Sequence, residues 1–179
     1  FEIDNYYSWD KKFEKILNQN KVYFSNFEVF NPFKKIITNI EYKKNICILI
    51  PSKLHFSNSQ DKLIKNLKII IDELKEVKKL GYKIYAKPHP RINQNLEIKL
   101  LKKNNIKILN KNLNINIVSD MSNFLICTLS SGIFYFIKKK RNIMILENKF
   151  IKPIKSYYPI FKYKKTIIIK NNKILKYFN

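Results

Sequence analysis

The sequence predicts an α/β fold, with a parallel sheet covered by helices on its faces. Three observations predict it. Short, continuous apolar runs are typical of strands that are buried on both faces; amphipathic helical patterns lie between these runs; and strand and helix alternate four times between residues 45 and 146. With 179 residues, 45% of them hydrophobic, the chain is long and apolar enough to bury one such core.

The regular pattern begins at residue 45. Residues 46–50 form an apolar run that Pro51 ends, and we expect a buried strand there. Capping residues follow at Ser57-Asn58-Ser59. A helix of about five turns comes next, because apolar side chains recur three or four residues apart, and Gly81 lies where helices commonly end. These apolar residues are Ile64, Leu67, Ile71, Leu74 and Val77.

The alternation continues to residue 146. A strand is predicted over residues 82–86, with the loop Lys87-Pro88-His89-Pro90-Arg91 at its carboxyl end. Further strands are predicted over 106–109, 124–129 and 143–146, helices over 96–103 and 133–140, and an Asn-rich loop over 110–116. Residues 45–150 are therefore expected to form a Rossmann-like domain.

The two ends of the chain are less regular. Residues 1–44 are interpreted as a connector or the edge of a preceding lobe, with a helical pattern over 11–18, an extended aromatic segment over 21–30 and a short helix over 33–40. Residues 151–179 are a C-terminal tail that includes an extended segment at 166–169, and no role is assigned to it. The chain opens with Phe1 and polar residues, unlike a signal peptide, so we expect a segment of a longer protein.

The charge is strongly basic but rich in lysine. There are 36 Lys and Arg against 13 Asp and Glu, a formal net charge of +23, and 34 of the basic residues are Lys. Lysine has A/T-rich codons, so nucleotide bias explains much of the basicity. Nucleic-acid recognition favours the planar fork of arginine, and we expect no nucleic-acid partner. A positive field would still attract phosphate-bearing substrates and would allow peripheral contact with the cytoplasmic face of an inner membrane.

Several classes of protein are excluded. Cys47 and Cys127 lie in apolar runs, so we expect buried, reduced thiols and a cytoplasmic location. No run of 18 apolar residues occurs that would predict a membrane-spanning helix. Two histidines leave little for a multi-histidine metal site, and no cofactor is expected. The motifs of dinucleotide enzymes, P-loop NTPases, zincins and α/β-hydrolases are absent.

The loop at residues 87–91 follows a predicted strand, at the sheet edge where ligands bind in open α/β sheets. His89 lies between two prolines, which restrict the backbone on both sides of it. Imidazole can donate a hydrogen bond to a phosphate oxygen or protonate a leaving phosphate, and Lys87 and Arg91 add positive charge. The alternative is a solvent-exposed turn.

A second loop, Ser130-Ser131-Gly132, lies where a predicted strand gives way to a helix. Two hydroxyls and several free backbone N–H groups are expected to converge at the helix N-terminus, which would favour an anion, and Gly132 would let the backbone approach a ligand. The alternative is a serine N-cap. Because both loops follow strands of one sheet, the sequence favours a phosphate site shared between them.

Other polar residues carry weaker expectations. His55 follows the first buried strand and could face the same site, or be an ordinary loop histidine. Asp120 and Glu147 lie near strand ends and could bind a ribose hydroxyl. Three acidic residues of the long helix are expected to be solvated, namely Asp72, Glu73 and Glu76.

The His89-Pro90 motif, within YAKPHPR, together with the serine pair within ICTLSSG, resembles bacterial GT-B sialyltransferases of the lipooligosaccharide and polysialic-acid type. It is also similar to capsule Kdo transferases and, more distantly, to CDP-glycerol glycerophosphotransferases. The resemblance covers about residues 45–150 and implies the C-terminal, nucleotide-binding lobe of a GT-B glycosyltransferase. It implies that His89, Ser130 and Ser131 contact the phosphate of a cytidine nucleotide.

The function implied is transfer of sialic acid, a related nonulosonic acid or Kdo from a CMP-activated donor to a bacterial surface glycan or glycolipid, without a metal. His89 would be catalytic. The nucleotide would be bound by Lys87, Pro90, Arg91, Ser130, Ser131 and Gly132. CMP is expected to bind at least as well as CDP.

One feature of the resembling families is missing from this sequence. Their general base lies in an acidic-acidic-Gly motif, and neither Gly81 nor Gly132 follows two acidic residues. The base is therefore expected upstream of residue 1. Two alternatives stay open: CDP-glycerol-dependent polymer synthesis, and a non-catalytic basic module that binds membrane or nucleic acid.

Overall fold

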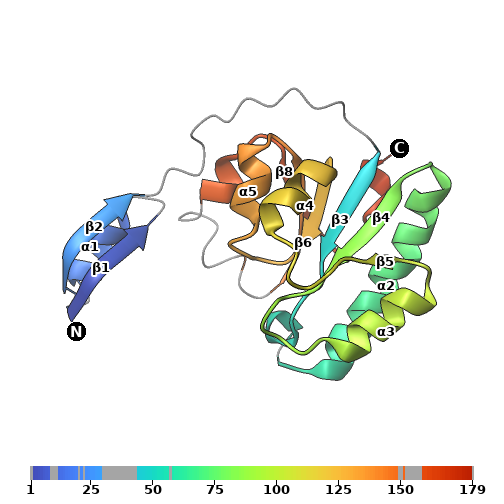
Figure 1. Ribbon diagram of the computed structural model, residues 1–179, viewed down its shortest axis with the longest axis horizontal. Helices are drawn as coiled ribbons and strands as arrows, with labels where there is room; N and C mark the ends of the chain where they lie inside the picture. The colour runs from blue at the N-terminus through green and yellow to red at the C-terminus, as the bar shows by residue number, and fades with distance from the viewer. Residues whose placement is uncertain are drawn as a thin grey trace. The chain divides into compact units, whose positions relative to one another are not determined.

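The computed structural model describes residues 2–8, 12–19, 21, 23–29, 44–56, 58–148, 151 and 159–178. The chain divides into two compact units, residues 1–36 and 37–179 (Figure 1). In the first unit, β1 (Glu2–Ser8) and β2 (Tyr23–Val29) pair in parallel, with α1 (Lys12–Gln19) between them in the chain. The sequence predicted α1 and β2 but not β1, whose residues are largely polar. The helix expected over 33–40 lies outside the described residues.

The second unit contains a parallel sheet of six described strands, in the order β5-β4-β3-β6-β7-β8. The strands are β3 (Asn45–Leu49), β4 (Lys83–Lys87), β5 (Lys107–Ile108), β6 (Phe124–Cys127), β7 (Asn142–Leu146) and β8 (Thr166–Ile169). The chain moves outward from β3 to β5 and then returns to the other side of β3 with β6. This doubly wound order confirms the predicted Rossmann-like fold and places the topological switch point between β3 and β6.

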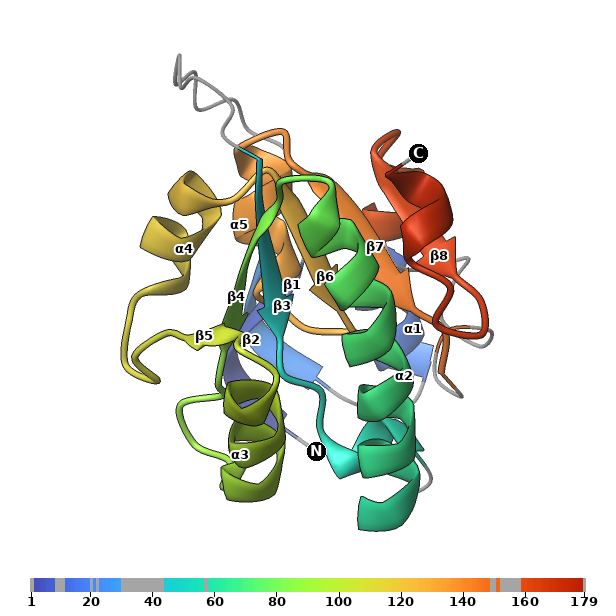
Figure 2. The ribbon, with the colours of Figure 1, turned by 90° about the vertical axis from the view of Figure 1, so that its right-hand side faces the viewer.

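Helices cover both faces of this sheet. The described helices are α2 (Gln60–Lys79), α3 (Asn95–Lys103), α4 (Ile115–Met121) and α5 (Ile133–Lys138), with short 3₁₀ turns η1 (Lys53–Phe56), η2 (Pro159–Lys162) and η3 (Leu175–Tyr177). Figure 2 shows α4 and α5 on one side of the sheet and α2 on the other. The apolar runs are therefore strands buried on both faces, as expected for a parallel sheet.

Successive residues of a strand pack into the core on opposite faces of the sheet. Ile46 and Ile48 of β3 belong to the cluster that packs against α2, where Leu67 and Leu74 are fully buried. Successive strand residues point to opposite faces, so Cys47 lies on the side of α4 and α5. Both cysteines are buried and free, as predicted. Burial raises the pKa of the Cys47 thiol to about 12 and holds that of Cys127 well above its ordinary value.

Local signals set the helix boundaries. Ser59 caps α2 by accepting a hydrogen bond from the Lys62 N–H at 3.3 Å, and Gly81 follows the helix with a φ of +86°, where a side chain would be strained. The sequence did not predict α4. Asn114 caps it, and Val118 packs inward, within a segment whose asparagines resemble a loop.

The segment at residues 166–169 is β8, which pairs with β7 and forms the edge of the sheet. Part of the predicted tail therefore belongs to the fold. In the part of the chain that the structure describes, no helix has the length and apolar character needed to span a membrane.

Candidate functional site

A cavity of about 750 Å³ opens at the carboxyl edge of the sheet, at the topological switch point. Its walls are the segments that follow β3, β4 and β6, together with the loop between β5 and α4. Small-molecule sites in proteins measure about 300–1,000 Å³ and favour this position in doubly wound sheets. The topology thus brings the two loops selected from the sequence to one cavity.

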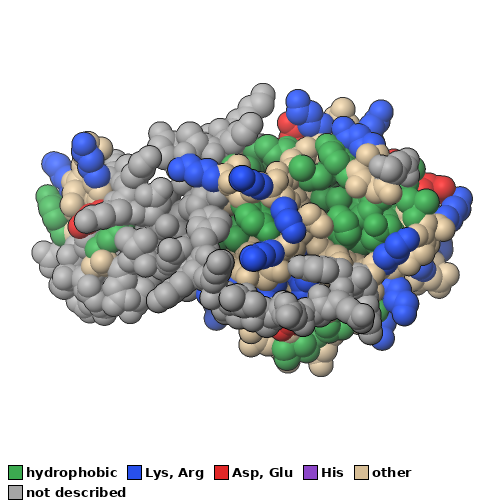
Figure 3. Space-filling model, turned by 90° about the horizontal axis from the view of Figure 1, so that it is seen from above, with side chains coloured by type: hydrophobic (Ala, Val, Ile, Leu, Met, Phe, Trp, Pro, Cys, Tyr) green, Lys and Arg blue, Asp and Glu red, His purple; other side chains and the backbone are tan. Residues whose placement is uncertain are grey.

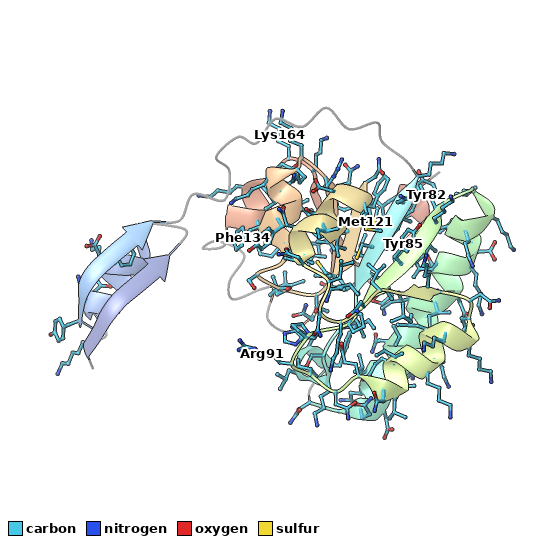
Figure 4. All side chains as sticks on the ribbon, in the orientation of Figure 1. Tyr82, Tyr85, Arg91, Met121, Phe134 and Lys164 are labelled. Carbon is cyan, nitrogen blue, oxygen red and sulfur yellow. The ribbon has the colours of Figure 1, made fainter. Side chains whose placement is uncertain are left out.

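Most of the residues selected from the sequence line this cavity. They are Lys87, His89, Pro90, Ser130, Ser131 and Gly132. Arg91 does not line it, and Figure 4 shows its side chain directed outward from the loop. The backbone of Arg91, rather than its guanidinium group, takes part in the site.

The ring of His89 is held by its own loop. The Arg91 backbone N–H donates to Nδ1 of His89 at 3.1 Å. Because Nδ1 accepts this hydrogen bond, the proton of the neutral ring lies on Nε2, which is then a donor. The residue is exposed at the cavity wall. His89 therefore offers an N–H group that suits a phosphate oxygen.

Gln94, which the sequence analysis did not select, fixes the backbone of the same loop. Its side chain is buried, and Oε1 accepts a hydrogen bond from the His89 N–H at 2.7 Å. Its amide nitrogen donates to the carbonyl oxygens of Ile50 and Pro51 at 2.9 and 3.2 Å. The end of β3 and the His89 loop are thereby joined through one side chain.

Lys87 supplies a buried cation beside the cavity. The residue is only 6% exposed, and its ammonium donates to the carbonyl oxygens of Pro88 at 2.8 Å and Lys111 at 2.7 Å. Burial lowers the pKa of Lys87 from its ordinary value. Lys87 thus joins the end of β4 to the loop after β5, in addition to placing charge in the wall.

The serine pair differs from the expectation. Ser130 Oγ accepts a hydrogen bond from the Gly132 N–H at 3.2 Å. The N–H groups of residues 133–135 donate to the carbonyl oxygens three residues earlier. The expected set of free backbone N–H groups is therefore reduced, because the helix begins with tight turns of the 3₁₀ kind. The hydroxyls of Ser130 and Ser131 are the main donors that this loop presents.

At Gly132 the limited space for a side chain matters, and the backbone conformation does not require glycine. Its φ is −57°, which any residue adopts. A Cβ atom there would lie 3.4 Å from Ile115 Cγ1, 3.4 Å from Ser130 Oγ and 3.5 Å from Leu49 Cδ1. The cavity wall at this point is therefore already in close contact with its neighbours.

His55 also lines the cavity, together with Thr128, a residue that the sequence analysis missed. His55 Nδ1 lies 3.2 Å from the Ser52 carbonyl oxygen and 3.2 Å from Thr128 Oγ1. Burial is the largest influence on the pKa of His55 and lowers it, against hydrogen bonds with the backbone of Ser52 and Leu129 that raise it. The ring is therefore held in the neutral form near pH 7.

The lining of the cavity is basic. Its basic side chains are Lys87, Lys111, His55 and His89, and no Asp or Glu is among the described lining residues. Asp120 and Glu147, which were considered for a ribose, are not in the lining, and Asp120 pairs with Lys139 at 2.7 Å. In the described part of the chain, no three His, Cys, Asp or Glu side chains gather where they could hold a metal ion. The arrangement suits an anionic ligand such as a phosphate.

Comparison with known proteins supports a transferase. Residues 33–152 match the family model described as CDP-glycerol:poly(glycerophosphate) glycerophosphotransferase, whereas no curated protein and no solved structure matches the chain. Of the resemblances drawn from the motifs, the distant one is thus supported, and those to sialyltransferases and Kdo transferases are not. The matched segment covers more than half of the chain and contains every lining residue of the cavity. The chain therefore belongs to the CDP-glycerol:poly(glycerophosphate) glycerophosphotransferase family, a glycosyltransferase-like family of transferases.

Proposed function

We propose that the cavity binds CDP-glycerol and that the protein transfers glycerophosphate from this donor to a poly(glycerophosphate) acceptor. The observation that carries the proposal is the lining of the cavity at the switch point of a doubly wound sheet: its described residues include two lysines, two histidines and three serines, and no carboxylate. A diphosphate carries several negative charges, and a lining without carboxylates does not repel it.

The proposed reaction is a substitution at phosphorus. A hydroxyl oxygen of the acceptor attacks the phosphorus that bears the glycerol and forms a new P–O bond. The P–O bond to the cytidylate part breaks, the bonding electron pair leaves with CMP, and the proton of the acceptor hydroxyl is released to water. Negative charge grows on the leaving phosphate oxygen, so fixed donors near that oxygen lower the barrier.

The chain offers donors of this kind. The Nε2–H group of His89 is fixed by the acceptor role of Nδ1 and would donate to the leaving phosphate. The hydroxyls of Ser130 and Ser131 would donate to the other phosphate oxygens, and Lys87 would add charge from the wall. Positioning and electrostatic stabilisation account for most catalysis of phosphoryl transfer.

The family match changes the expected nucleotide. From the sequence we expected a CMP-activated sugar, with CMP bound at least as tightly as CDP. The description of the matching family names a CDP-linked donor. The cavity also has histidines in the segments that follow two different strands. We therefore propose a diphosphate donor in place of the CMP-sugar.

Calorimetry with CDP-glycerol, CDP, CMP and CMP-sialic acid tests this proposal, together with a transfer assay on a poly(glycerophosphate) acceptor. CDP-glycerol is expected to bind more tightly than CMP or CMP-sialic acid, and to donate its glycerophosphate. Tighter binding and turnover of the CMP-sugar would overturn the proposal. Duplex DNA and anionic vesicles are the controls for a non-catalytic basic module, because a specific ligand raises the melting temperature by mass action.

A further inference from the structure

We infer that Gln94 is a positioning residue for His89, holding the loop and the ring in the form that donates from Nε2. The inference rests on the proposed function, because His89 is assigned there as a donor to the leaving phosphate. Nothing in the residue type or spacing of Gln94 marks it in the sequence. The inference comes from its position, its burial and its three hydrogen bonds.

The position of Gln94 is unusual for its residue type. It is the N-cap of α3, where Asn, Asp, Ser and Thr are preferred because their short side chains accept hydrogen bonds from the first turn. The Gln94 side chain makes no such bond. It is turned inward instead and is only 3% exposed. Gln94 thus makes contacts on the other side of the residue in place of a cap hydrogen bond. Such departures from a local sequence preference are common at functional sites.

Those contacts join two strand ends. The amide nitrogen donates to the Ile50 and Pro51 carbonyl oxygens after β3, and Oε1 accepts from the His89 N–H after β4. Ile50 and His89 both line the cavity. Because β3 and β4 are neighbours in the sheet, one planar amide sets the separation of the two walls that they carry.

The hydrogen bond to the His89 N–H also bears on the ring. Pro88 and Pro90 fix their own φ angles, so the orientation of the peptide groups around His89 decides whether the Arg91 N–H reaches Nδ1. Gln94 holds the first of these peptide groups at 2.7 Å, and the Arg91 N–H closes the turn at 3.1 Å. Without the Gln94 amide the turn can open. The proton can then move from Nε2 to Nδ1, and the phosphate loses its donor.

Three variants of the 179-residue chain test this inference. Gln94→Met removes the hydrogen bonds and keeps the length of the side chain. Gln94→Asn supplies a good helix cap but is one methylene too short to reach both strand ends, so it separates folding from positioning. Gln60→Met is the matched control, because Gln60 makes one side-chain hydrogen bond, to Glu97 Oε1 at 2.8 Å, and does not line the cavity.

Two measurements are made on each variant. The ¹⁵N chemical shifts of the His89 ring report the tautomer, and calorimetry reports the affinity for CDP. In the wild type and in Gln60→Met, Nδ1 of His89 is expected to carry no proton and Nε2 to be protonated. In Gln94→Met and Gln94→Asn the two tautomers are expected to mix, and the affinity for CDP to fall about tenfold, as for a lost charge-assisted hydrogen bond.

A merely structural role would give a different result. If Gln94→Asn, or Gln94→Met where it folds, lowers the melting temperature as Gln60→Met does and leaves the His89 tautomer unchanged, the inference is overturned. Failure of the proposed function is separate. If the wild type does not bind CDP, the proposed function fails, and the ring shifts alone decide whether Gln94 positions His89.

Discussion

Two basic hollows lie at opposite ends of the same sheet and differ in construction. The cavity at the carboxyl ends of the strands has two lysines and two histidines in its lining. A second hollow of about 540 Å³ lies at the amino ends of β4 and β5 and contains more lysines. Its lining residues are Lys75, Lys78, Lys79, Lys103, Asn104 and Asn105.

The lysines at the amino end are exposed, and two of the four are paired with acidic side chains. Lys75 pairs with Asp72 at 2.8 Å and Lys79 with Glu76 at 2.8 Å, on a helix face that was expected to be solvated. Glu73 departs from that expectation, because its carboxylate accepts from the Leu175 N–H. Exposed ion pairs of this kind contribute about 0–1 kcal/mol. These lysines are held loosely and are screened by salt.

At the carboxyl end the basic side chains are fewer, and two of them are held in place. Lys87 is buried and donates to two carbonyl oxygens, and the ring of His89 is oriented by a backbone N–H. Figure 3 shows Lys and Arg side chains spread over the face that it views, with apolar and uncharged groups between them. Basic residues are therefore common on this protein, and what distinguishes the cavity is the fixed geometry of a few donors.

The largest expected effect is on turnover. In the active enzyme, His89→Ala should lower kcat for glycerophosphate transfer by about 10²-fold or more, the usual scale for a group that acts on a leaving phosphate. Steady-state kinetics with CDP-glycerol measures it. Replacing Lys75, Lys78, Lys79 and Lys103 together by Gln changes more charge and should leave kcat within about twofold. A larger loss in that fourfold variant than in His89→Ala would reverse the comparison.

The two ends should also differ in stability. Lys87→Met leaves the Pro88 and Lys111 carbonyl oxygens without their donor, and a buried group without a partner costs about 1–3 kcal/mol. Lys103→Met, at the exposed end of α3, should change the free energy of unfolding by less than about 0.5 kcal/mol. Urea denaturation of both variants checks this difference. Equal losses would mean that the Lys87 hydrogen bonds contribute nothing.

Replacing the two glycines of the chain tests the shape of the two regions without changing their charge, and a smaller effect is expected. Gly132→Ala adds a methyl group 3.4 Å from Ser130 Oγ at an ordinary φ, so stability should change by less than about 1 kcal/mol while the affinity for CDP falls. Gly81→Ala adds a methyl group in open space at a φ of +86°, so stability should fall by about 1 kcal/mol and affinity should not change. Calorimetry and thermal unfolding of both variants decide it. Unchanged affinity in Gly132→Ala would mean that a ligand does not approach this wall closely.

The sequence predicted those features of the fold and of the site that depend on where the strands end. The apolar runs placed the strands, and parallel strands present their carboxyl ends at one edge, so the convergence of His89 with Ser130 followed. Gln94 and Thr128 could not be found this way, because their partners Pro51 and His55 lie 43 and 73 residues away in the chain. The side chain of Arg91 was selected for its charge, whereas the structure uses its backbone N–H. Which groups of a loop face inward is decided by tertiary contacts that composition does not encode.

The last prediction concerns the pH dependence of stability, where the effect is smallest. The carboxyl end holds His55 half-buried, and burial lowers the pKa of its ring from the ordinary value of 6.5. The unfolded chain therefore takes up a proton at His55 before the folded chain does. The contribution of His55 to stability is complete above pH 6.5 and is lost as the pH falls below that value toward the lower pKa of the folded state. His55→Gln should remove this part of the pH dependence, while the carboxylates contribute equally to both proteins. Urea denaturation of the two proteins between about pH 5 and pH 8 measures the difference in slope, and identical slopes would show that the protein environment does not disfavour the charged ring of His55.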